Sequence, residues 1–232
     1  MRRDVPQKPY TARQAAPLLS RFGLACLVMF PTLLAGAEVL DRIAVTVDKR
    51  VITVNDIIRD LRVSALLDGS PVDLSIAAKR AAATRLVDRV LLLQEAATSH
   101  FDQAPGEDMG CRVDPKARYP MEQAFRAALA EYHLTEAELS AHLLDGQSAC
   151  EFTDLRFGPE VQITEQELRD AYSKFAADWA LTHAGQPVPS FESSRNQVEQ
   201  LLMGQRILEK LDAWLGMARG ERKIEYREAA FR

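Results

Sequence analysis

The sequence is poor in the residues from which catalytic and metal sites are most often built. Its 232 residues include three cysteines and four histidines, and no two histidines have the i,i+4 spacing of paired metal ligands on a helix. The chain has no C-x-x-C pair, H-E-x-x-H motif, P-loop, G-x-S-x-G elbow or G-x-G-x-x-G loop. We therefore expect no metal and no cofactor, and no local motif points to an enzyme.

Long hydrophobic runs are also scarce. The apolar run Gly23–Leu34 has twelve residues, too few to span roughly 30 Å of hydrocarbon as a stable anchor. It follows a leader with five basic residues and one acidic residue, and it precedes the small residues Ala35–Ala37. This order is typical of a secretory signal peptide over residues 1–37, cleaved between Ala37 and Glu38. An uncleaved membrane anchor is the alternative.

The charge balance argues against nucleic acid as a partner. The leader takes five of the 29 basic residues and one of the 33 acidic residues, so the mature chain would carry a net charge of −8. Phosphate contacts need clustered cations, which such a chain lacks.

Two cysteines remain after cleavage, Cys111 and Cys150. An even count in an oxidising compartment favours a disulfide, and closing a loop of about 40 residues could stabilise the fold by up to roughly 4 kcal/mol. Two reduced thiols are the alternative.

The two ends of the mature chain have the patterns of strands. Residues 43–47 alternate between larger and smaller side chains, a polar turn follows at 48–50, and residues 223–227 alternate again. Thr53 and Asp56 form a capping pair that predicts a helix start. We expect a mainly α fold with a small antiparallel sheet made by the N-terminal hairpin and a C-terminal strand.

Apolar residues at helical spacing fill most of the chain between these strands. They predict helices over 74–98, 119–132, 135–144, 164–175 and 192–218. Thr135 and Thr164 begin capping boxes. Gly146 is expected to stop one helix, and residues 152–157 are expected to be extended. Residues 100–118 and 176–190, which contain Gly and Pro, are expected to be irregular.

The acidic pairs Glu136/Glu138 and Glu165/Glu167 could act in acid–base chemistry, but each lies in a predicted first helical turn, where the helix dipole favours acids. Met121, Phe125 and Tyr132 share one face of a predicted helix. They could line a groove for a client polypeptide, or they could form a core stripe.

The ordered set of segments resembles the SurA-like periplasmic chaperones, secreted folding factors that often carry a parvulin (PpiC-type) prolyl isomerase domain. The similar segments, in chain order, are 43–48, 51–57, 85–96, 133–139, 163–172 and 214–226. The resemblance implies a SurA N-terminal-like helical domain over 38–175 and a connector over 176–190, where a parvulin domain would be inserted. The long helix and strand over 191–232 would complete the same module.

The resemblance departs from the isomerase-bearing members at this connector. Only about twenty residues separate Tyr172 from Glu192, and the chain contains no Gly-Gly pair, whereas a parvulin domain has about one hundred residues. The resemblance therefore implies an ATP-independent holdase of the periplasm that binds unfolded envelope or outer-membrane proteins through an apolar groove. A residual prolyl isomerase, or an adaptor that recruits a separate foldase through residues 100–118, is the alternative.

Overall fold

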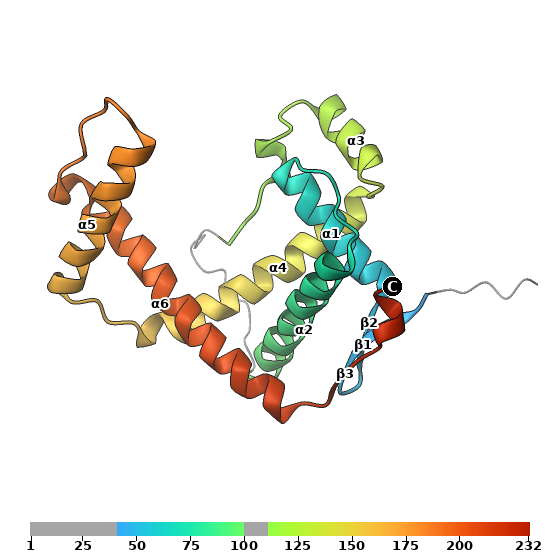
Figure 1. Ribbon diagram of the computed structural model, residues 1–232. Helices are drawn as coiled ribbons and strands as arrows, with labels where there is room; N and C mark the ends of the chain where they lie inside the picture. The colour runs from blue at the N-terminus through green and yellow to red at the C-terminus, as the bar shows by residue number, and fades with distance from the viewer. Residues whose placement is uncertain (1–40, 100–110) are drawn as a thin grey trace, which may run out of the picture. The chain divides into compact units, whose positions relative to one another are not determined.

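The computed structural model describes residues 41–99 and 111–232, which are mainly helical with one small sheet (Figure 1). The strands are β1 (Ile43–Val47), β2 (Arg50–Thr53) and β3 (Ile224–Tyr226). The α-helices are α1 (Val54–Asp68), α2 (Ile76–Thr98), α3 (Glu122–Glu131), α4 (Glu136–Phe157), α5 (Glu165–Thr182) and α6 (Phe191–Glu221). Short 3₁₀ turns are η1 (Pro115–Ala117), η2 (Gly158–Glu160) and η3 (Glu228–Ala230).

The predicted fold class, mainly α with a small antiparallel sheet, is thus confirmed. The predicted signal peptide and its cleavage site at Ala37–Glu38 lie outside the described residues, as does the first part of the predicted loop over 100–118. None of the described helices combines the length and the apolarity that a membrane crossing requires.

The sheet joins the two ends of the described chain, as the sequence predicts. Its order is β2-β1-β3, and both pairs are antiparallel. The turn between β1 and β2 contributes to this junction. Asp48 has a φ of 52°, a left-handed conformation that Asp tolerates better than most residues. Its carboxylate accepts a hydrogen bond from the Lys223 N–H at 3.0 Å, and its own N–H donates to the Lys223 carbonyl at 2.9 Å.

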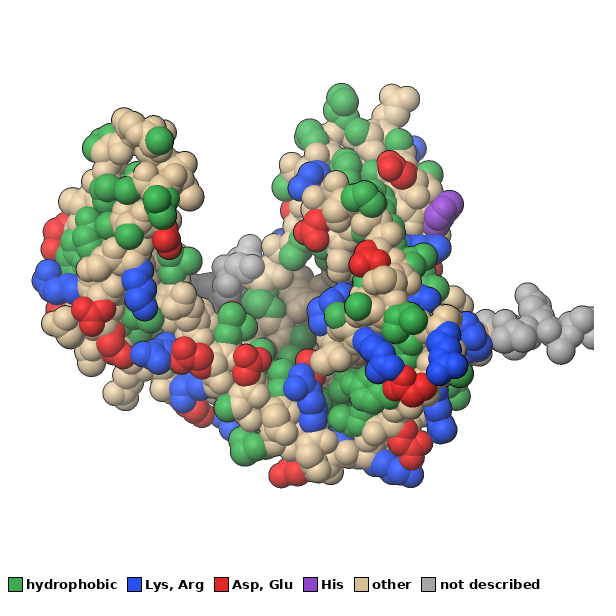
Figure 2. All heavy atoms as spheres, viewed as in Figure 1, with side chains coloured by type: hydrophobic (Ala, Val, Ile, Leu, Met, Phe, Trp, Pro, Cys, Tyr) green, Lys and Arg blue, Asp and Glu red, His purple; other side chains and the backbone are tan. Residues whose placement is uncertain are grey.

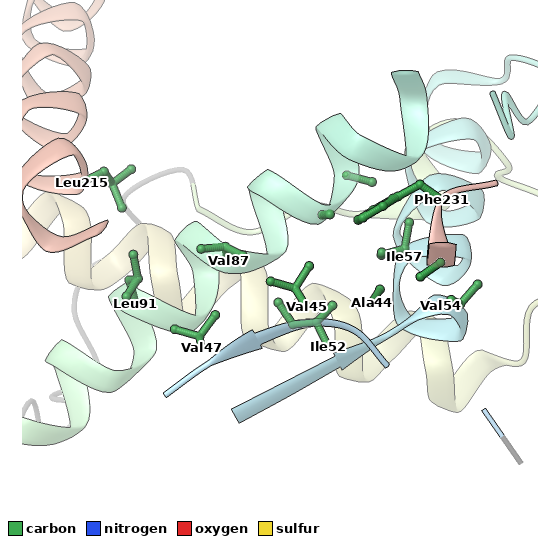
Figure 3. Close-up of a cluster of buried hydrophobic side chains, with 13 residues drawn as sticks. Ala44, Val45, Val47, Ile52, Val54, Ile57, Val87, Leu91, Leu215 and Phe231 are labelled. Carbon is green, nitrogen blue, oxygen red and sulfur yellow. The ribbon is translucent and has the colours of Figure 1, made fainter. Parts of the chain in front are cut away.

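The largest core cluster lies between the sheet and the helices that cover it (Figure 3). Val45 and Val47 of β1 are fully buried against Val87 of α2. Leu215 of α6 and Phe231, near the C-terminus, belong to the same cluster. The end of the chain therefore supplies part of the core on which the first strands rest.

Three further groups of contacts complete the packing, the first being a small core of α2 and α4 that includes Leu92 and Phe152. The end of α1, α3 and the start of α4 share a second core that includes Leu66, Phe125 and Leu139. Helix α5 packs on the first half of α6. Ion pairs support that contact, from Arg195 to Glu165 and from Arg206 to Glu167, at 2.6 and 3.0 Å.

The helix starts that the sequence predicts are confirmed. Thr53, Thr135 and Thr164 each accept a hydrogen bond from a backbone N–H three residues on, and the acidic side chain at that position bonds back. These reciprocal bonds satisfy two of the backbone donors that a helix leaves unpaired at its start.

The predicted end of α4 is wrong. The helix does not stop near Gly146 but continues to Phe157, so residues 152–157 are helical rather than extended. An internal glycine costs about 1 kcal/mol relative to alanine. Burying Phe152 and Phe157 contributes roughly 1.5–3 kcal/mol for each side chain, which outweighs that cost. Pro159, which has no N–H to donate, then ends the helix.

The predicted connector over 176–190 is too long by seven residues, because α5 continues to Thr182. The Trp179 ring lies 5.8 Å from the Phe175 ring and stacks on the His183 ring at 3.8 Å. The glycine and prolines that predicted an irregular segment all lie after this point, from Gly185 on. The segment between α5 and α6 is therefore 183–190.

Candidate functional site

The second carboxylate of each acidic pair is part of a helix cap. Glu138 accepts a hydrogen bond from the Thr135 N–H at 2.9 Å and lies 3.4 Å from Arg59. The hydrogen bonds from Thr135, and then the positive charge of Arg59, hold the pKa of Glu138 below its usual range. Glu167 has the same arrangement with Thr164 and Arg206, and its pKa is lowered for the same reasons. Both carboxylates are ionised and already bonded, which suits a structural role.

The described residues bring together one group with the composition of a metal site, Cys111, Cys150 and Asp154, whose potential ligand atoms lie within 4.8 Å of one another. The structure joins Cys111 and Cys150 in the disulfide that the sequence favours. Neither sulfur is then a thiolate, and a thiolate is the form in which cysteine binds metal. The arrangement therefore suits a covalent clip between α4 and the chain that precedes α3.

The face proposed for client binding divides between core and surface. Phe125 is only 5% exposed and belongs to the core of α1, α3 and α4. Tyr132 packs against that core, and its hydroxyl donates to the Ser70 carbonyl at 3.0 Å. Met121 is 70% exposed at the start of α3. The groove interpretation of these residues is corrected for Phe125, which a client could not reach in this fold.

An apolar groove lies instead between α4 and α6. It consists of a hollow of about 1020 Å³ and a second one of about 430 Å³, which share Asp154, Gly204 and Ile207. We call it the α4–α6 groove. Its lining residues are Leu92, Ala149, Cys150, Thr153, Asp154, Leu155, Gly158, Pro159, Asn196, Glu199, Gln200, Met203, Gly204, Ile207, Leu208 and Leu211.

Small residues open this groove. Gly204 stands in the middle of α6, and a Cβ added there would meet no atom within 4 Å. Ala149 and Gly158 contribute little side-chain volume on the opposite side. Leu155 and Leu208 are exposed at its edges. The face of the molecule that Figure 2 shows mixes exposed hydrophobic side chains with charges of both signs.

The charged residues that line the groove are all acidic. Asp154 and Glu199 line it, and none of its lining residues is Lys, Arg or His. Burial raises the pKa of Asp154 above its ordinary value. Thr153 already donates its hydroxyl hydrogen to the Ala149 carbonyl at 2.8 Å. The lining residues among those described therefore include no nucleophile beside a base.

Sequence reasoning does not find this groove, which depends on the missing side chain of Gly204 in α6. The signal that the sequence offers is that glycine with Leu208 one turn later on the same helix, but it does not indicate which helix lies opposite. No family model, curated protein or solved structure matches this chain. The function is therefore argued from the groove and from the resemblance described above.

Proposed function

We propose that this chain is an ATP-independent periplasmic chaperone that holds unfolded envelope or outer-membrane proteins, and that it binds them in the α4–α6 groove. The observation that carries the proposal is the groove itself, which is open, mainly apolar and without a nucleophile–base pair among its lining residues. A mainly apolar hollow of about 1020 Å³ with a few polar groups has the size and composition of a binding site.

The side chains of the groove suit clients of varied sequence. Met203 is unbranched and flexible, so it can adapt to different apolar partners. Asn196 and Gln200 offer amides to the backbone of an extended segment. Since the chain has no nucleotide-binding motif, release follows from weak affinity and from folding of the client.

The SurA-like architecture is part of the same proposal. A sheet that joins the first and last strands, with the helices between them, supports the order of segments that the resemblance implies. The connector between α5 and α6, residues 183–190, supports a module without an inserted isomerase domain.

The test uses a pair of glycine substitutions on one helix. Gly204→Trp fills the groove, whereas Gly216→Trp places the same side chain elsewhere on α6, and at both positions an added Cβ meets open space. We expect the purified protein to slow aggregation of a urea-denatured outer-membrane protein at near-stoichiometric ratios. Gly204→Trp should lose most of this effect, and Gly216→Trp should keep it.

Other outcomes would contradict the proposal. Failure of the unsubstituted protein to slow aggregation would remove the holdase, and equal losses in both tryptophan variants would remove the groove as its site. A protease-coupled proline-peptide assay should show no acceleration above background, because acceleration would favour the isomerase. Co-purification with one stable foldase, without binding to several clients, would favour the adaptor.

A further inference from the structure

Asp154 occupies the centre of the α4–α6 groove. It lines both hollows, together with Gly204 and Ile207, so a segment that lies along the groove passes its carboxylate. Most of the neighbouring lining is aliphatic, including Leu155 and Leu208. The groove therefore presents the Asp154 carboxylate at its centre, within a mainly apolar surface, and the other acidic residue of the lining, Glu199, belongs to the larger hollow alone.

This carboxylate has no cation among the described residues. Its Oδ2 lies 3.4 Å from the Cys111 Sγ, and a disulfide sulfur has no hydrogen to donate. The stretch of sequence from residue 100 to 110 contains no Lys or Arg. Burial, which disfavours the ionised form, raises the pKa of Asp154, and no positive charge on residues 41–99 or 111–232 offsets that effect.

Two other acidic residues close to the groove, Glu160 and Asp88, are paired with cations of the protein itself. Glu160, just beyond α4, bonds Arg156 at 2.8 Å and Lys210 at 3.1 Å. Asp88 on α2 forms a two-pronged bond with Arg219, at 2.8 and 2.6 Å. Glu160 and Asp88 thus have cations of their own, whereas Asp154 has none among the described residues and is open to a cation from outside.

We infer that the α4–α6 groove selects extended polypeptide segments in which a lysine or arginine is flanked by apolar residues, the cation pairing with Asp154 and the apolar side chains filling the hollows beside it. This inference rests on the proposed holdase function and specifies its client class. A bound cation would return to Asp154 the stabilisation that burial removes, and charge-assisted bonds are roughly twice as strong as neutral ones.

The experiment compares two fluorescein-labelled peptides that are identical except for a central Lys or Gln between apolar residues. Fluorescence anisotropy gives the Kd of each peptide for the full chain. We expect the Lys peptide to bind about fivefold more tightly at 50 mM salt, with a smaller ratio at 300 mM salt because salt screens an exposed part of the pair.

Two charge-neutralising variants distinguish the effect of the Asp154 carboxylate from the effect of the protein's overall negative charge. Asp154→Asn should bring the ratio of the two Kd values near one, and its Kd for the Gln peptide reports any change that the substitution makes in the apolar contacts. Asp178→Asn removes the same charge from α5, outside the groove, where the structure gives Asp178 no ion pair. That variant should keep the fivefold ratio.

The possible results distinguish failure of the charge preference from failure of the proposed holdase function. Equal binding of both peptides, with loss of both in Gly204→Trp, overturns the charge preference and leaves the holdase intact. A ratio that survives in Asp154→Asn also overturns it. If neither peptide binds and the protein does not slow aggregation, the proposed function fails. If neither binds and sedimentation shows dimers that Gly204→Trp disrupts, the groove holds a second copy of the chain, and the inference is overturned.

Discussion

At the scale of residues, the least exposed charge in the described chain is Asp60, which is 1% exposed on α1. Arg85 of α2 lies 2.5 Å from its carboxylate, and Arg89, on the same helix, lies at 4.0 Å. His142 of α4 approaches from the other side, with its Nε2 at 3.5 Å. A buried carboxylate without such partners would be strongly destabilising. The cluster therefore requires α1, α2 and α4 to meet in one arrangement.

His142 should make stability depend on pH. Burial, and then the positive charge of Arg89, lower its pKa, while Asp60 and Asp145 act in the opposite direction and Arg59 adds to the lowering. The pairing with Asp60 alone would favour a charged ring, but two arginines already neutralise that carboxylate. The folded state thus holds a neutral His142, whereas the unfolded histidine titrates near pH 6.5.

The stability of the folded state should fall as the pH falls, because the two states bind the proton of His142 with different affinities. The unfolded state binds the proton more readily, so the contribution of His142 to stability is fully present above about pH 6.5 and is lost as the pH falls below that value. We expect the urea midpoint to fall between pH 7.5 and pH 5, and to fall less in His142→Gln. A protein that is more stable at pH 5, or a variant with an unchanged pH slope, would contradict this account.

At the scale of elements, the disulfide between Cys111 and Cys150 ties α4 to the chain before α3. The two cysteines are 39 residues apart, so in the chain-entropy account the bond contributes up to roughly 4 kcal/mol. Replacing both by serine should lower the free energy of unfolding by that order, measured by guanidinium denaturation. The unsubstituted protein under reducing conditions should match the double variant. A midpoint unchanged by reduction would argue that the bond adds no stability.

Helix starts could be predicted from local sequence, whereas the length of one helix could not. The three threonine caps could be predicted because a cap depends on residues three positions apart. The length of α4 could not, because a rule that penalises Gly146 does not include the burial of Phe152 and Phe157. The α4–α6 groove could not be predicted from the sequence for a related reason. It exists where Gly204 leaves space between helices that are distant in sequence, and no local pattern encodes that distance.

At the scale of the whole molecule, the end of the chain closes the fold. Phe231 is 1% exposed in the core shared by the sheet, α1 and α2. Arg80 of α2 lies over its ring, 5.4 Å from the centroid, and also pairs with Glu228. Strand β3 covers one side of β1, so its loss would leave the central strand with an unpaired edge.

Phe231→Ala should therefore destabilise the molecule far more than its position, one residue from the C-terminus, would indicate. Truncating a buried phenylalanine costs about 3–5 kcal/mol, and the midpoint of urea unfolding, followed by circular dichroism, should fall accordingly. Tyr226→Ala is the matched control, because Tyr226 lies in β3 but is 40% exposed, and we expect a loss of at most about 1 kcal/mol. If both variants unfold at the same midpoint as the unsubstituted protein, the C-terminal segment rests on the core without supporting it. A large loss for Phe231→Ala alone would show that the first strands need the last residues of the chain to remain folded.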